Sequence, residues 1–161
     1  MMMLLTQQPA EVSPVFLIVF VAAIIGLTFL FMKGASDKAT EVIKKRFEGK
    51  IIADCTLGKK FCIYCFVTED EFVIQKNQSS FIAYPLAKIA YAKAYRDRAA
   101  EQWAFTVFDK NQKKKDLDGK MLTGAQNTRK YNGSTLFFMS KDQAETLCDF
   151  LAQHAPHVEI L

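Results

Sequence analysis

The chain has 161 residues, of which 50% are hydrophobic and 24% are charged, and its net charge at pH 7 is +4. This composition predicts a folded globular part and excludes a largely disordered chain. The small positive charge suits an anionic membrane surface, and it gives little support to nucleic-acid binding, so no nucleic-acid partner is expected.

An uninterrupted apolar run occupies residues 15–32, VFLIVFVAAIIGLTFLFM. As an α-helix with a rise of about 1.5 Å per residue it would be about 27 Å long, close to the ~30 Å hydrocarbon core of a bilayer. Ser13 and Pro14 favour a helix start directly before it, because Ser is a good N-cap and Pro fits the first helical position. The sequence therefore predicts a transmembrane helix over residues 14–32, preceded by a short extracytoplasmic N-terminus over residues 1–13.

The main alternative for this run is a secretory signal peptide. Such a peptide has a basic n-region, an apolar stretch of about 7–15 residues and a small-residue cleavage site. Here residues 1–13 contain no Lys or Arg, the apolar run is longer, and the following residues are basic. A buried core helix is disfavoured as well, because the run is apolar on every face.

The charges beside the run give it a direction. Residues 33–50 contain six Lys and Arg residues, and none precedes the run. By the positive-inside rule, the N-terminus lies outside and the larger C-terminal part lies in the cytoplasm, with the chain as a single-pass protein of the plasma or inner membrane. A cytoplasmic location also predicts reduced cysteines, and a chain of this size needs no disulfide to complete its core.

Residues 33–49 are predicted to form a basic juxtamembrane helix or linker that stops at Gly49, a common residue just past a helix end. Apolar residues recur in it at helical spacing: Ala39, Val42, Ile43 and Phe47. Two interpretations are open. Either this apolar stripe packs on the following domain, or the segment lies on anionic lipid with Lys44, Lys45 and Arg46 at the head groups.

From residue 50 onward the pattern changes to short β-type runs separated by turn residues. Strands are predicted at residues 51–55, 60–67, 72–75, 81–84, 89–95, 103–108 and 134–139. Pro85 marks a strand edge or a bend. Residues 121–131 are ambiguous between an irregular strand and a loop. A C-terminal amphipathic helix follows, in which Ser140 and Gln143 have the spacing of a capping box.

Three stretches of this region resemble one known family. Residues 66–74 form an apolar strand, a Thr-led acidic turn and a second apolar strand; residues 84–91 read Tyr-Pro-Leu-Ala-Lys-Ile-Ala-Tyr; residues 137–156 form a last strand and a helix. Together with the order of strands followed by one helix, they are similar to the pleckstrin-homology-like (PH-like or GRAM-like) domains of small bacterial membrane-associated proteins. The resemblance covers about residues 50–156.

The resemblance implies an α+β fold for residues 50–161: a bent antiparallel sheet or open barrel capped by the C-terminal helix. It also implies binding of lipid head groups, peptides, partner domains or a second copy, and not catalysis. Members that bind head groups carry basic residues in the first hairpin loop. Here that loop, residues 56–60, contains only Lys59 and Lys60, which weakens the case for phosphoinositide recognition.

Few residues suggest chemistry. Cys62 and Cys65 form a C-x-x-C motif, but on a strand this spacing places the two side chains on opposite faces, which favours packing over a redox or metal site. His154 and His157, the only histidines, favour a helix-capping or solvated role. The sequence has no Ser/His/Asp arrangement, no Gly-rich phosphate loop and no paired-carboxylate motif. We therefore expect no enzyme activity, no cofactor and no metal site.

The densest basic run contains Lys110, Lys113, Lys114 and Lys115. It is either a solvated hairpin tip or a contact with the anionic leaflet or an acidic partner, where each Lys contributes about 1 kcal/mol.

These observations predict a membrane-anchored cytoplasmic PH-like interaction module that binds a protein partner, a second copy or an anionic lipid surface. The alternative is an accessory or structural subunit of a larger membrane complex, assembled through the transmembrane helix. In that reading the small residues Ala22, Ala23 and Gly26 would allow another helix to approach closely.

Overall fold

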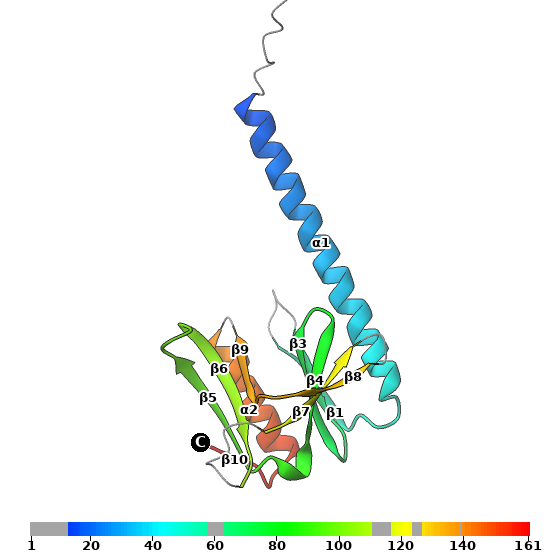
Figure 1. Cartoon of the computed structure of the whole chain (residues 1–161), viewed down its shortest axis with the longest axis vertical. Coiled ribbons are helices and arrows are strands. Elements are labelled where there is room, and N and C mark those ends of the chain that lie inside the picture. Colours follow the sequence, from blue (N-terminus) through cyan, green and yellow to red (C-terminus); the bar gives the residue numbers. More distant parts are fainter. Residues whose placement is uncertain (1–12, 58–62, 111–116, 124–126, 139) are drawn as a thin grey trace, which may run out of the picture. The chain divides into compact units, whose positions relative to one another are not determined.

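A computed structural model gives the structure of the chain, and it describes residues 13–57, 63–110, 117–123, 127–138 and 140–161. The chain divides into two compact units, Met1–Gly34 and Ala35–Leu161. The fold is α+β, as predicted: one long apolar N-terminal helix, mostly antiparallel sheet structure and a C-terminal helix (Figure 1).

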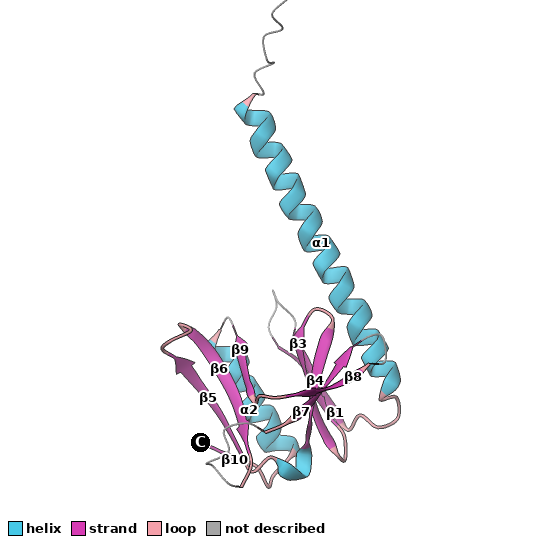
Figure 2. Cartoon of the chain, viewed as in Figure 1, coloured by secondary structure: helices cyan, strands magenta, loops and turns pink. Residues whose placement is uncertain are grey.

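Helix α1 extends from Pro14 to Arg46 (Figure 2). The helix begins where the sequence predicted. In its first turn the backbone N–H of Leu17 donates to the carbonyl oxygen of Ser13 at 3.2 Å. In the first unit, every Val, Leu, Ile and Phe side chain of residues 15–31 is exposed. This part of α1 is long and apolar enough to span a membrane.

Helix α1 is continuous where the sequence predicted two helices. It passes through Gly34 and Ser36 and ends at Arg46. A single Gly inside a helix costs only about 1 kcal/mol relative to Ala, so the end of the apolar run does not end the helix. A turn over residues 47–50 follows, in which Gly49 has φ +75°, the left-handed conformation that favours glycine after a helix.

Two sheets make up the β part of the second unit. Sheet A has six strands in the order β1-β2-β3-β4-β7-β8, and all neighbours are antiparallel. Its strands are β1 (Ala53–Leu57), β2 (Ile63–Val67), β3 (Glu71–Asn77), β4 (Ser80–Pro85), β7 (Gly119–Thr123) and β8 (Thr128–Tyr131). The ambiguous residues 121–131 thus contribute to two paired strands.

Sheet B has four strands in the order β10-β5-β6-β9. Its strands are β5 (Tyr91–Asp97), β6 (Gln102–Phe108), β9 (Thr135–Phe138) and β10 (Glu159–Ile160). Strand β10, which was not predicted, pairs with β5 in parallel. The 3₁₀-helix η1 (Leu86–Lys88) joins β4 to β5 directly after Pro85, the predicted bend.

Helix α2 (Lys141–His154) packs on β5, β6 and β1. The predicted cap is present, since the hydroxyl oxygen of Ser140 accepts the backbone N–H of Gln143 at 3.3 Å. The apolar face of α2 includes Leu147 and Leu151, which have no exposed surface. These side chains belong to the first core cluster, which also contains side chains of both sheets.

A second core cluster lies on the other face of sheet A. The alternation of side chains along β2 shows the division: Tyr64 and Phe66 belong to the second cluster, and Cys65 and Val67 belong to the first. The central strands β2, β3 and β4 of sheet A are therefore buried on both faces. This explains why β2 and β4 are nearly continuous apolar runs and do not alternate with polar residues.

Candidate functional site

The C-terminal part of α1 packs on sheet A through its apolar stripe. Ile43 has no exposed surface and Ala39 is buried, and both lie in the second core cluster with sheet residues such as Phe66. The ring of Phe47 meets that of Phe66 edge-on, with 5.1 Å between the centroids. The first of the two interpretations of this segment is thus confirmed for Ala39, Ile43 and Phe47, which pack on the domain, whereas Val42 is exposed.

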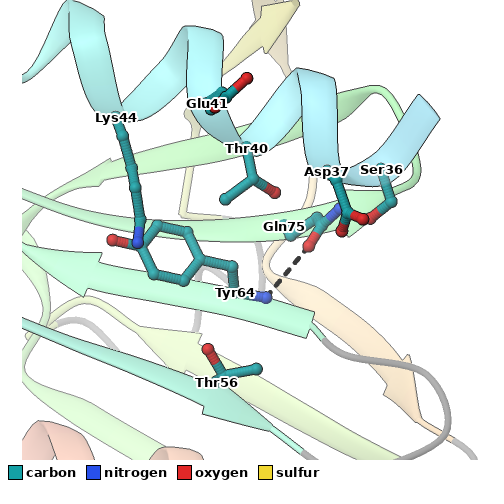
Figure 3. A pocket seen from close by; sticks show the side chains of 8 residues that line it. All are labelled: Ser36, Asp37, Thr40, Glu41, Lys44, Thr56, Tyr64 and Gln75. Carbon is teal, nitrogen blue, oxygen red and sulfur yellow. Dashed lines mark hydrogen bonds between the residues drawn. The ribbon is translucent and has the colours of Figure 1, made fainter. Parts of the chain in front are cut away.

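A buried glutamine links this helical segment to the sheet by hydrogen bonds (Figure 3). The side-chain oxygen of Gln75 on β3 accepts the backbone N–H of Tyr64 on β2 at 3.0 Å. Its amide nitrogen donates to the hydroxyl of Ser36 on α1 at 2.9 Å. Gln75 therefore replaces a backbone bond of the sheet and at the same time satisfies a hydroxyl of the helix.

A tyrosine, a carboxylate and a lysine meet beside this contact. The Tyr64 hydroxyl donates to Asp54 Oδ2 at 2.9 Å. Lys44 Nζ lies 3.5 Å from the same oxygen and 4.3 Å from the centroid of the Tyr64 ring. Because the Lys44 and Asp54 side chains are both about half exposed, their ion pair contributes at most about 1 kcal/mol. Burial, and then the hydrogen bond to Asp54, raise the pKa of Tyr64 above its ordinary value of 10.0.

A cavity of about 220 Å³ lies between the helix and the sheet (Figure 3). Its lining residues are Ser36, Asp37, Thr40, Glu41 and Lys44 from α1 and Thr56, Tyr64 and Gln75 from the strands. The cavity is smaller than the roughly 300–1,000 Å³ of typical small-molecule sites. No buried side-chain nitrogen or oxygen of the described residues lacks a hydrogen-bond partner. We therefore interpret it as a gap along the helix–sheet contact.

The basic residues at the end of α1 differ in their surroundings. Lys44 is engaged by Asp54, and Arg46 Nη2 donates to the Thr128 hydroxyl of β8 at 3.0 Å. Lys45 is exposed, and its side chain has no ion pair or hydrogen bond to another residue in the described ranges. Of the three, Lys45 is therefore the residue whose charge is most available to a partner or a lipid surface.

The second predicted basic group is only partly described. Lys110 is exposed at the residue where the described chain stops after β6, and Lys113, Lys114 and Lys115 lie outside the described residues. Two other lysines of sheet A are engaged by carboxylates. Lys120 lies 3.4 Å from Glu71, and Lys130 lies 2.9 Å from Asp118.

The small residues of the apolar helix remain open to contact. Ala22, Ala23 and Gly26 are exposed on α1. A Cβ atom added at Gly26 would meet no atom of the chain within 4 Å. A larger residue at this position would therefore leave the fold of the chain unchanged and affect only a helix that packs there from another molecule.

The cysteines and histidines of the described residues are placed by packing. Cys55, Cys65 and Cys148 are free thiols, and burial, followed by the charges of Asp149 and Glu145, raises the pKa of Cys148 to about 11. His157 is exposed, as the predicted solvated role requires, and its Nε2 also lies 3.1 Å from the carbonyl oxygen of Leu86, so it connects the chain end to η1. The first residue of the C-x-x-C motif, Cys62, lies outside the described ranges.

The described residues contain no group of three or more His, Cys, Asp or Glu side chains that could hold a metal ion. Comparisons with protein-family models, with curated proteins and with solved structures find no match. The resemblance to PH-like domains therefore stays a prediction based on three stretches of sequence. The site that the structure itself provides is the surface formed by the end of α1 and sheet A.

Removing the Tyr64 hydroxyl tests the polar part of this surface. Below pH 10 the phenol is protonated in both folded and unfolded chains; above pH 10 the unfolded chain ionises first, because the folded pKa is raised. The wild type should thus lose up to about 1.4 kcal/mol of stability per pH unit above pH 10 through this residue. Tyr64→Phe should lack this component and should cost about 1 kcal/mol at neutral pH through the lost hydrogen bond.

The measurement is urea denaturation of the full chain in detergent micelles at pH 7 to 11. Tyr91→Phe, a half-buried tyrosine of sheet B, is the matched control, because it tests for general effects of removing a phenol. Equal alkaline slopes for wild type and Tyr64→Phe would contradict the assignment of Tyr64.

Proposed function

We propose that the protein is a single-pass membrane protein that presents residues 35–161 in the cytoplasm as a PH-like interaction module. The single observation that carries the proposal is that the two ends of helix α1 have different surroundings. Its residues 15–31 expose every large apolar side chain, whereas Ala39 and Ile43 of the same helix belong to the core of the second unit. Helix α1 thus contributes residues to both units.

The membrane assignment is supported by energetics. In water, thirteen exposed Val, Leu, Ile and Phe side chains on one segment would create a far larger apolar surface than soluble monomers carry. A bilayer removes that surface from water and leaves every backbone hydrogen bond of the helix intact. The six basic residues after the run support a cytoplasmic location for the second unit.

The assignment as a binding module is supported by the resemblance to PH-like domains and by the exposed charges. Lys45 and Lys110 are exposed, whereas Lys44 and Arg46 are engaged within the domain. We propose that the exposed lysines contact either a protein partner or the anionic leaflet. Concentration at the membrane by α1 allows a contact that is weak by itself to become occupied.

A photo-crosslinking amino acid at position 45 or 110 tests this proposal in the protein's own membrane. We expect an adduct at one or both positions: a large increase in mass identifies a protein partner, and a lipid-sized increase identifies the leaflet. Lys88, which is exposed in η1, is the matched control position. Crosslinking at positions 45 and 110 that does not exceed that at position 88 would contradict the proposal.

The alternative of an accessory subunit rests on Ala22, Ala23 and Gly26. These three exposed small residues lie within about one and a half turns of α1, which suits close packing of a second helix. In this reading the partner is bound inside the bilayer, and the crosslinker would react at position 23 and not at position 45.

A further inference from the structure

Strands β1 and β2 place two cysteines directly opposite each other. Cys55 pairs with Cys65 in the antiparallel register. The backbone N–H of Tyr64 is directed toward β3, where it bonds to Gln75. Because successive N–H groups of a strand point to opposite sides, the N–H of Cys65 is directed toward β1, and the two cysteines form a hydrogen-bonded pair.

The Cα spacing of this pair permits a covalent bond between the two side chains, and forming it draws the Cβ atoms together from about 5.5 Å to about 3.5–4.5 Å. Residues in a hydrogen-bonded antiparallel pair have Cα atoms about 5.5 Å apart, within the roughly 4.4–6.8 Å found for disulfides. The two side chains lie directly opposite each other on the same face of sheet A, and the Cys55 side chain is one of the groups that act on the Cys65 thiol.

The two thiols differ in accessibility. Cys65 has no exposed surface and belongs to the first core cluster, and its burial raises the pKa of its thiol. Cys55 is half-buried on β1, which is the edge strand of sheet A. An external reagent therefore reaches Cys55 first.

We propose that Cys55 and Cys65 form a reversible cross-strand disulfide when the protein meets a small-molecule disulfide such as oxidised glutathione. The Cys55 thiolate attacks one sulfur of oxidised glutathione and releases one glutathione thiolate, which leaves a mixed disulfide. The Cys65 thiolate then attacks the Cys55 sulfur and releases the second glutathione. The two cysteine protons end on the two glutathione molecules, and the two electrons lost by the cysteines reduce the oxidant.

The disulfide would stabilise the contact between the C-terminal part of α1 and sheet A. The side chain next to Cys55 in β1, Asp54, points to the opposite face, where it binds the Tyr64 hydroxyl and Lys44. A disulfide that fixes β1 to β2 would hold Asp54 in place and restrict fraying of the edge strand. Disulfides in reducing compartments are usually transient and redox-sensing, and a reversible bond at an edge strand matches that use.

The test uses the full chain in detergent micelles, incubated with oxidised glutathione and then alkylated. Trypsin cleaves at Lys50, Lys59 and Lys60, so Cys55 and Cys65 fall on separate peptides, residues 51–59 and 61–76. We expect these peptides to be joined, with the intact chain lighter by two hydrogen atoms, and to separate after dithiothreitol. Because Cys62 shares the second peptide, the assignment is made in the Cys62→Ser variant.

Oxidation should also raise the midpoint of thermal unfolding by roughly 5 °C, because it closes a loop in the unfolded chain. Cys55→Ser and Cys55→Ala, at the half-exposed position, should abolish both the joined peptides and this rise. Cys148→Ser should retain both. A glutathione adduct that persists at Cys55, a bridge that requires Cys62, or thiols that stay unoxidised would each overturn the proposal.

Discussion

Arginine in place of both Ile24 and Ile25 is expected to remove the protein from the membrane fraction. The two residues lie at the middle of the apolar run, and both are exposed on α1. One Arg at the centre of a membrane helix costs roughly 2.5–3.5 kcal/mol on insertion scales. Two would disfavour insertion by about 6 kcal/mol, or about 10⁴-fold. The measurement is the fraction of protein that stays with alkali-washed membranes.

The control variant carries arginine at Ala35 and Val42, which are exposed on the same helix beyond the apolar run. It should stay in the membrane fraction like the wild type. Retention of the Ile24→Arg, Ile25→Arg variant would count against a spanning helix. The intact mass of the wild-type protein distinguishes a spanning helix from a secretory signal peptide. Cleavage of a signal peptide would remove the apolar run and the residues before it, and the mass would fall accordingly.

Truncation of Ile43 to alanine should lower the free energy of unfolding by about 3 kcal/mol. Ile43 has no exposed surface and lies among the side chains of sheet A, so Ile43→Ala removes buried carbon atoms and leaves a cavity. Val42 is the neighbouring β-branched residue, but it is 43% exposed. Val42→Ala should therefore change stability by no more than about 0.5 kcal/mol.

The measurement is denaturant unfolding of the full chain in micelles, followed by the fluorescence of Trp103 on β6. Equal effects of the two substitutions would show that the end of α1 does not pack on the sheet in solution. The same contact determines where a soluble fragment must begin. A fragment that starts at residue 50 lacks Ala39 and Ile43 and exposes one face of sheet A, whereas one that starts at Ala35 retains the second core cluster.

The parts of the fold that depend on local signals could be predicted from the sequence. Helix α1 starts at Pro14, the predicted first-position proline, and the start of α2 follows from its Ser140 cap. The continuity of α1 was missed for a physical reason. A change from apolar to polar residues ends a membrane segment, but it does not interrupt backbone hydrogen bonding, and a single Gly34 is tolerated.

The candidate site could be predicted only in part, because its contacts depend on register and long-range pairing. Lys44 and Arg46 were grouped as surface charges, but Arg46 bonds to Thr128, 82 residues away in sequence. The C-x-x-C motif directed attention to Cys62, whereas the hairpin register places Cys55 opposite Cys65. A spacing along one strand gives no information about the residue across from it.

Ile43 and Leu122 share the second core cluster, and this has a consequence for synthesis of the chain. Leu122, which belongs to the same cluster, leaves the ribosome after roughly 80 more residues, which takes about 4–16 s at about 5–20 residues per second. During this interval the apolar stripe of α1 has no completed sheet to cover it. In the membrane-anchored protein that we propose, the membrane interface is a competing apolar environment for this stripe until β7 has been synthesised.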